Sequence, residues 1–337
     1  MNALALRRII GTEHPFVPIR GEGLPVAVSP DAAPLADSSD ATLRALTDRF
    51  AQRAGEFDRD GRFPHANFAD LHRHGLVGMV AAGGFGGGQA SLADARRVIA
   101  AVSAGDAATG LVLTMTYLQH YAIARPGSRW PAVPRDAVLG SGLERGALIN
   151  ALRVEPELGS PARGGLPATI ARRGADGGWR LSGHKTYSTG IPALSWLAVW
   201  ARTDEDAPRV GMFLVPRDAG GIRVVETWDH LGLRASCSHD VLFDDVALPG
   251  DHAVDVRLPA DWAPIDGSPA ARELAAQTAW MVVLLGSLYD AVARSAATWL
   301  KDFLRSRVPA SLGKPLASLP RMQEAVGQIE ALLWANR

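Results

Sequence analysis

Three segments of this sequence concentrate aromatic, hydroxyl and amide groups that could bind a ligand: residues 150–160, 181–190 and 228–249. The second segment places the ring of Tyr187 beside the hydroxyls of Ser188 and Thr189. A flat, mostly apolar ligand with a polar edge needs this combination, because a ring packs against its face while hydroxyl and N–H groups bind its edge. Taken alone, however, Tyr187 is equally typical of an aromatic in a β barrel and Thr189 of a hydroxyl in a turn.

Other patterns of reactive residue types are interpreted as structural. The glycine-rich run at 83–88 lacks the Lys-Ser/Thr ending of a phosphate-binding loop and follows no predicted strand, so it is predicted to be a loop between helices. The Ser-His-Asp run at 238–240 has the residue types of a catalytic triad, but neighbours on a strand point to opposite faces. His72 and His74 are expected to be a surface pair at a helix end, so no metal site is predicted.

The composition is that of a globular protein, with 47% hydrophobic and 21% charged residues in a chain of 337. Lys and Arg number 35, as do Asp and Glu, and this zero net charge argues against a nucleic-acid binder. The single cysteine, Cys237, excludes an intramolecular disulfide. No apolar run reaches the roughly 20 residues that span a bilayer. Arg7 and Arg8 follow the first apolar residues, the reverse of a secretory signal, so we expect a cytoplasmic protein.

The pattern of residues changes three times along the chain. Residues 1–37, rich in Pro, Gly and Ala, predict a flexible tail, and helical spacing then predicts a helical domain over 38–146. Short runs typical of strands follow over 147–255 and predict a β barrel or sandwich, before helical spacing returns over 268–337. The predicted strands are 147–153, 168–172, 179–182, 196–201, 210–216, 222–227 and 241–246, and the predicted helices include those from Leu92, over 109–124, over 271–302 and from Arg321.

The three segments together resemble the acyl-CoA dehydrogenase family. Residues 154–160 (VEPELGS) resemble the family's T-E-P-G-x-G-S loop, and residues 183–190 (GHKTYSTG) resemble its G-x-K-x-[WY]-x-[TS]-[NG] strand and turn. Residues 232–249 (GLRASCSHDVLFDDVALP) carry the most specific resemblance, which extends over about 40–337. It implies an α+β multidomain fold: an α-helical N-terminal domain, a central β barrel and a C-terminal helical bundle, with a flavin between barrel and bundle.

The resemblance also implies an activity and a set of site residues. The activity is α,β-desaturation of an acyl-CoA thioester by hydride transfer to flavin N5, with FAD as the cofactor and FMN as the alternative. Tyr187 falls where the family places an aromatic against the flavin, and Thr189 falls where it places a hydroxyl near N5. The other implied cofactor-binding residues are Asn150, Leu152, Arg153, Val154, Gly159, Ser160, Ser188 and Arg305, of which Ser160 also falls near the acyl-CoA.

Several departures from the dehydrogenase pattern resemble the dibenzothiophene-monooxygenase-like branch of the same fold, which uses reduced flavin. Val154 replaces a threonine, and Asn150 and Trp228 are closer to that branch. The branch has a histidine on an N-terminal-domain helix, where this chain has Thr116, with His120 one turn later. Both are therefore candidates for substrate binding, although His120 could equally be a histidine packed against the barrel.

Desaturation needs a carboxylate base within reach of the α-proton. The family's usual glutamate lies late in the bundle, past residue 337, and its earlier position falls near Gln277. Glu273, one turn before, is the remaining candidate base. We therefore expect an incomplete bundle with little or no desaturation activity, and the alternatives are a reduced-flavin-dependent monooxygenase or a non-catalytic assembly module.

The C-terminal helices also predict self-association. A stripe of Met281, Leu284, Leu285 and Leu288 lies along one helix face. A half bundle would leave that stripe uncovered, so we expect a homo-oligomer, a dimer or tetramer, built through residues 271–337.

Overall fold

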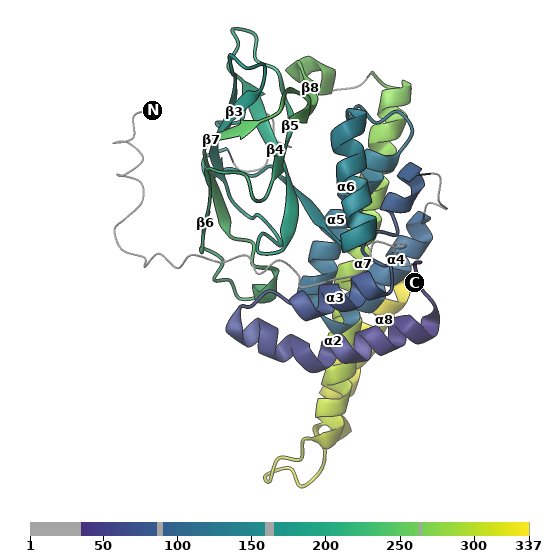
Figure 1. Cartoon of the computed structure of the whole chain (residues 1–337). Coiled ribbons are helices and arrows are strands. Elements are labelled where there is room, and N and C mark those ends of the chain that lie inside the picture. Colours follow the sequence, from purple (N-terminus) through teal and green to yellow (C-terminus); the bar gives the residue numbers. More distant parts are fainter. Residues whose placement is uncertain (1–34, 86–89, 159–164, 263–264, 337) are drawn as a thin grey trace, which may run out of the picture.

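The computed structural model describes residues 35–85, 90–158, 165–262 and 265–336. Nearly all of the predicted tail lies outside these residues, as do Gly159, Ser160 and part of the glycine-rich run. The described chain runs from helices through one β-sheet to two further helices (Figure 1). This order is the one that the sequence predicts.

The N-terminal helices form because capping residues flank amphipathic runs. Ser39 caps α2, which ends at Gly61 in the left-handed conformation with φ 62°. Ser91 forms a capping box at the start of α4. The sequence did not predict α6, because the buried side of this helix is built largely from small and polar residues. The helices are α2 (Asp40–Asp60), α3 (His65–Arg73), α4 (Leu92–Gly105), α5 (Ala107–Ala124) and α6 (Ala132–Arg145).

The middle of the chain forms a single curled sheet of eight strands (Figure 1). The order along the sheet is β6-β7-β3-β2-β4-β5-β8, and β1 pairs with β4 beside this path. The sequence predicted seven strands and missed β8, a short edge strand whose polar positions blur the alternation. The strands are β1 (Leu148–Leu152), β2 (Ile170–Arg173), β3 (Trp179–Lys185), β4 (Leu194–Thr203), β5 (Val210–Pro216), β6 (Ile222–Val225), β7 (Asp240–Leu248) and β8 (Ala253–Arg257).

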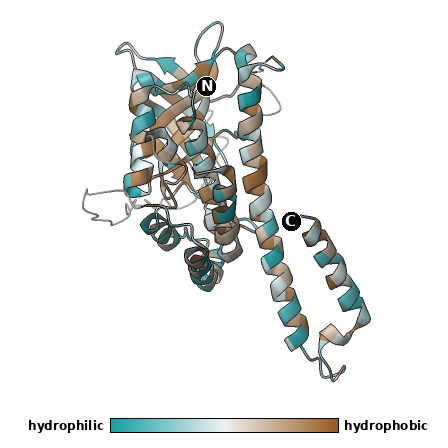
Figure 2. Cartoon of the chain, turned by 90° about the vertical axis from the view of Figure 1, so that its right-hand side faces the viewer, coloured by the Kyte–Doolittle hydropathy of each residue, from teal (hydrophilic) through white to brown (hydrophobic). Residues whose placement is uncertain are grey.

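The C-terminal part consists of a long helix, α7 (Pro269–Ser306), and α8 (Pro320–Ala335). The first half of α7 packs against α4 and α5, whereas its second half extends past the body of the molecule with α8 running back beside it (Figure 2). By length and composition alone, α7 could cross a membrane. Leu284 and Leu288 of this helix are buried in the main hydrophobic core, and 22% of its most apolar stretch of 18 residues is buried inside the molecule.

The predicted apolar stripe on α7 is covered at two of its four residues. Leu284 and Leu288 are fully buried, because α4 and α5 pack against this helix. Met281 remains 44% exposed and Leu285 is half-buried. The expectation of an uncovered stripe is therefore correct for only part of it.

Candidate functional site

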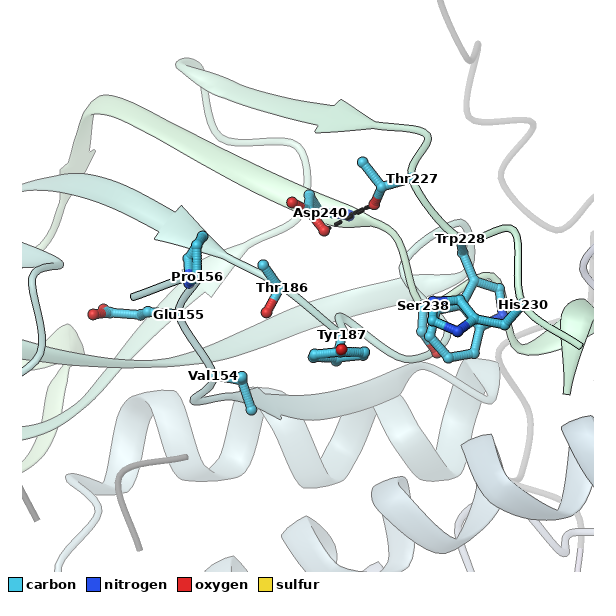
Figure 3. A pocket seen from close by; sticks show the side chains of 10 residues that line it. All are labelled: Val154, Glu155, Pro156, Thr186, Tyr187, Thr227, Trp228, His230, Ser238 and Asp240. Atoms are coloured by element: carbon cyan, nitrogen blue, oxygen red, sulfur yellow. Dashed lines mark hydrogen bonds between the residues drawn. The ribbon is translucent and has the colours of Figure 1, made fainter. Parts of the chain in front are cut away.

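A pocket of about 350 Å³ lies where β3 ends and β7 begins (Figure 3). It is bounded by the segment after β1, the turn after β3 and the segment between β6 and β7. The lining residues are Val154, Glu155, Pro156, Thr186, Tyr187, Thr227, Trp228, His230, Ser238 and Asp240. All three of the segments that the sequence singled out therefore meet at one pocket.

A buried ion pair fixes the two strand ends that carry the pocket. Lys185 Nζ lies 2.7 Å from Glu155 Oε1, and neither side chain is more than 3% exposed. Glu155 also accepts hydrogen bonds from Thr169 N at 3.0 Å and Thr169 Oγ1 at 2.6 Å. Burial lowers the pKa of Lys185 to about 8, against the opposing effect of Glu155. Burial favours the neutral form of Glu155, but Lys185 and Thr169 hold its pKa below the usual range.

The turn after β3 presents an aromatic ring to the pocket. Tyr187 has φ 54°, in the left-handed region that a bulky residue rarely adopts, and its side chain is 55% exposed. The backbone on either side is held, since Thr186 N donates to Val154 O at 3.0 Å and Ser188 N donates to His239 O at 3.1 Å. Strained backbone of this kind persists where surrounding bonds determine it, and it gathers at ligand sites.

The hydroxyl of Thr189 lies beside this ring in a row of hydroxyl groups. Thr189 Oγ1 accepts a hydrogen bond from Ser238 Oγ at 3.0 Å, and Ser238 lies 2.8 Å from Ser236 Oγ. Asn150 Nδ2 donates to the Thr189 carbonyl at 3.1 Å. Among the residues that the structure describes, the proton of the Thr189 hydroxyl reaches only the Tyr187 carbonyl, at 3.5 Å, so it is held weakly and can be offered to a ligand.

Two further aromatic rings form the other wall of the pocket. The rings of Trp228 and His230 lie 3.9 Å apart, and Trp228 meets Tyr187 edge to face at 6.0 Å. Trp228 is fixed at two points, because its ring N–H donates to Leu233 O at 3.0 Å and its backbone N–H donates to His239 Nδ1 at 3.1 Å. The pocket therefore has two aromatic surfaces nearly at right angles, either of which can pack against one face of a flat ring, with hydroxyl groups nearby.

The predicted cofactor residues are only partly brought together. Val154 and Tyr187 line the pocket, and Asn150 and Thr189 adjoin it through hydrogen bonds. Leu152 is buried in the hydrophobic core. Three other candidates lie away from the pocket: Ser188 is buried, Arg153 lies over the Trp200 ring at 4.7 Å, and Arg305 is exposed and pairs with Asp302 at 3.2 Å. Gly159 and Ser160 lie outside the described residues.

The predicted substrate-binding residues lie in the interior. Thr116 is fully buried and donates to Ile149 O at 3.1 Å. His120 is also fully buried, neither ring nitrogen has a hydrogen-bond partner among the described residues, and burial lowers its pKa to about 4. A Cβ on Gly142 of α6 would lie 2.9 Å from His120 Cε1, so this ring is packed tightly against α6. His120 is thus a packed histidine in this structure.

Glu273 is engaged at a junction rather than free in the pocket. It forms an ion pair with Arg125 at the end of α5, and it is not among the residues that line the pocket. Gln277, one turn later, accepts two hydrogen bonds from Arg125 at 3.2 Å when its amide oxygen faces the guanidinium. Both positions that could hold an early base are therefore tied to one arginine.

Of the ten lining residues, only Val154 and Tyr187 were predicted as cofactor-binding residues, and Thr227 lies outside the three segments. Asp240 accepts a hydrogen bond from Thr227 Oγ1 at 2.8 Å and pairs with His184 Nε2 at 2.7 Å. The signal that could have indicated Thr227 is the run of polar residues that follows β6.

The expected surface pair of histidines is only half correct. His72 is 7% exposed, packed against Gly146, and burial lowers its pKa. His74 lies at the end of α3. Within the described parts of the chain, no three His, Cys, Asp or Glu side chains gather as metal ligands would.

Comparisons with known proteins agree with the geometry. The N-terminal domain of acyl-CoA dehydrogenases matches residues 38–130, and the middle domain matches residues 153–246. The putative acyl-CoA dehydrogenase YdbM of Bacillus subtilis (strain 168) is 30% identical over 285 residues, which are 85% of this chain and 70% of YdbM. The amino sugar nitrososynthase RubN8 of Streptomyces rubradiris is 31% identical over 266 residues, which are 75% of this chain and 59% of RubN8.

Solved structures show the same fold. KijD3 in complex with dTDP superposes with a TM-score of 0.73 at 30% identity, covering 90% of this chain and 73% of KijD3. The FMN-bound structure of TdsC from Paenibacillus sp. A11-2 gives a TM-score of 0.71 at 20% identity, covering 88% of this chain and 72% of TdsC, and so shows likeness of fold alone. Given the two domain matches and the extent of the likeness to YdbM, this chain belongs to the acyl-CoA dehydrogenase family.

Proposed function

We propose that the pocket between Tyr187 and Trp228 is the binding site of a flavin ring, and that the chain is the flavin-binding part of an oxidoreductase acting on a small molecule. The observation that carries this proposal is the exposed, conformationally strained Tyr187 beside the weakly held hydroxyl of Thr189. The volume of about 350 Å³ lies in the range of small-molecule sites. Structures of the related KijD3 hold FMN, which supports the same class of cofactor here.

The residues present fit this cofactor. Tyr187 would pack against one face of the flat ring with Trp228 at right angles beside it, and the Thr189 hydroxyl would donate to the polar edge, oriented by Ser238 and Asn150. A flavin, when bound, accepts a hydride in its oxidised form or delivers electrons to oxygen in its reduced form. The protein's part is to orient the ring and to keep one of its faces covered.

Between the two reactions of this fold, we propose the oxygen-dependent one. Desaturation requires a free carboxylate near the substrate. Glu273 is paired with Arg125, and the two carboxylates in the pocket are also engaged, Glu155 with Lys185 and Asp240 with His184 and Thr227. The likeness to the amino sugar nitrososynthase RubN8, at 31% identity, supports the same choice. Acyl-CoA desaturation is the second candidate, favoured by the likeness to YdbM.

The experiment first identifies the cofactor and then separates the reactions. Purified protein is titrated with FMN and with FAD, and any chromophore that co-purifies is identified by mass. Flavin-loaded protein is then mixed anaerobically with acyl-CoAs of several chain lengths. Separately, protein with reduced FMN is given oxygen and a panel of amino sugars and planar heteroaromatic compounds. We expect flavin binding, no bleaching by acyl-CoA, and oxygenated product in the second assay.

Two other experimental outcomes would favour the alternative functions, a dehydrogenase or a non-catalytic module. Prompt bleaching with formation of enoyl-CoA would establish the dehydrogenase reaction instead. Failure to bind either flavin would favour a non-catalytic module that acts through assembly.

A further inference from the structure

Arg234 is the centre of a set of hydrogen bonds just outside the pocket. Its Nε donates to Asp58 O at 2.9 Å, and one terminal nitrogen donates to Asp229 Oδ1 at 2.7 Å and to His230 O at 3.1 Å. Arg234 does not itself line the pocket. It therefore joins a helix of the N-terminal domain to the segment that carries the aromatic wall.

The contact with Asp58 is a capping interaction between two domains. Asp58 belongs to the last turn of α2, where carbonyl groups lack partners within the helix and the helix dipole is negative. A second hydrogen bond lies next to this contact, from Cys237 Sγ to Gly61 O at 3.3 Å. The two contacts attach the segment before β7 to the end of α2, about 176 residues away in the chain.

The other bonds of Arg234 hold the wall itself. Asp229 lies between Trp228 and His230 in the chain, so the bonds to its side chain and to the His230 carbonyl hold the backbone that carries both rings. The Trp228 ring N–H donates a hydrogen bond to Leu233 O, which joins the two ends of this segment. Leu233 has φ 55°, a conformation that costs energy for a branched residue and persists because the surrounding bonds impose it.

We propose that Arg234 is a positioning residue of the pocket, which fixes the Trp228 and His230 rings against the end of α2 and so sets the affinity for a flat ring. The guanidinium suits this task because its rigid planar fork holds separate N–H donors in fixed directions toward three acceptors, whereas the three donors of a lysine ammonium all lie on one atom of a flexible stem. The inference rests on the proposed function only in the choice of flavin as the flat ligand.

The test compares Arg234→Gln and Arg234→Lys with the wild type in the full chain. The matched control is Arg209→Gln, which removes an exposed ion pair to Glu205 of similar geometry, 2.7 Å, away from the pocket. FMN affinity is measured by titration, and thermal stability is measured as the midpoint of thermal unfolding. Near-UV circular dichroism reports how rigidly the Trp228 ring is held. Trp228→Phe identifies the part of the spectrum that belongs to this ring.

We expect Arg234→Gln to weaken FMN binding by about tenfold, which is the upper range for loss of an aromatic contact. The Trp228 signal should fall in both Arg234 variants, while Arg209→Gln should change neither. FMN affinity and Trp228 signal equal to those of the wild type in folded Arg234→Gln would overturn the inference. If the wild type binds no flavin, the proposed function fails, and the Trp228 signal alone still decides the role of Arg234.

Discussion

The hydroxyl of Ser238 donates a hydrogen bond to the hydroxyl of Thr189 at 3.0 Å, across 49 residues of chain. Thr189 follows β3 and Ser238 precedes β7, and these two strands pair along their length. The bond uses a lone pair of Thr189 and leaves its proton for another acceptor. Pairing of the two strands thus prepares one hydrogen-bond donor next to an exposed aromatic ring.

This arrangement predicts the effect of removing the ring or the hydroxyl. Tyr187→Ala should weaken flavin binding by about 1 kcal/mol or more, because an aromatic contact is lost. Thr189→Ala should weaken it by about 1 kcal/mol, the usual net worth of one hydrogen bond. Tyr289→Ala, which removes an equally exposed ring on α7, is the control and should leave binding unchanged. Unchanged affinity in both site variants would place the flavin elsewhere.

The ion pair of Glu273 with Arg125 predicts a structural role for this carboxylate. Glu273→Gln should lower the free energy of unfolding by about 1 kcal/mol at most, since the pair is partly exposed. It should leave the response to acyl-CoA unchanged, because flavin-loaded wild type is expected to show negligible bleaching. Anaerobic stopped-flow measurement checks this, and rapid bleaching in the wild type that Glu273→Gln abolishes would establish Glu273 as the base.

The unpartnered ring of His120 predicts a loss of stability in mild acid. Its pKa is about 4 in the folded chain and 6.5 in the reference state, so between these values the unfolded chain binds a proton that the folded chain does not. Above pH 6.5 the titration of His120 does not reduce the free energy of unfolding. As the pH drops from 6.5 toward 4, this free energy falls by about 3 kcal/mol in total.

A variant isolates this contribution. His120→Leu should flatten the dependence between pH 6.5 and 4 and should not destabilise the protein at neutral pH, because it removes an unsatisfied buried polar group. Denaturant unfolding at several pH values measures the difference between the two proteins. An identical pH dependence in both would mean that His120 is not the group responsible.

The exposed face of α7 predicts self-association. Val282, Tyr289, Val292, Trp299 and Phe303 are exposed, and Leu285 and Ala296 complete a spacing of alternating three and four residues. Such spacing suits packing against another long helix. An antiparallel copy would place large residues opposite small ones along this face, Phe303 against Val282 and Tyr289 against Ala296, so we propose that the partner is a second copy of this chain.

Light scattering tests this proposal. The chain should behave as a dimer or larger, and Trp299→Glu should shift it to the monomer, because a charge would be buried in the contact. Thr298→Glu adds the same charge next to the exposed face and should keep the wild-type mass. A monodisperse wild-type monomer at high concentration would contradict the proposal.

Local patterns in the sequence were enough to predict the order of helices, sheet and helices, the family, and the turn that carries Tyr187 and Thr189. These features are local: helical and strand spacing, capping residues such as Ser39 and Ser91, and turn residues act over a few positions. The two elements that the sequence did not predict, α6 and β8, were missed for a local reason as well, since small and polar residues interrupt their apolar patterns.

Which side chains meet depends on how whole helices and strands pack together, and the sequence did not predict it. Spacing shows that Leu284 and Leu288 share a face, but not that α4 and α5 cover it. Likewise, nothing near Glu273 in the sequence indicates Arg125, and nothing near Arg234 indicates the carbonyl of Asp58. These partners are far apart in the chain and are brought together by the packing of whole elements. Local sequence patterns therefore do not predict them.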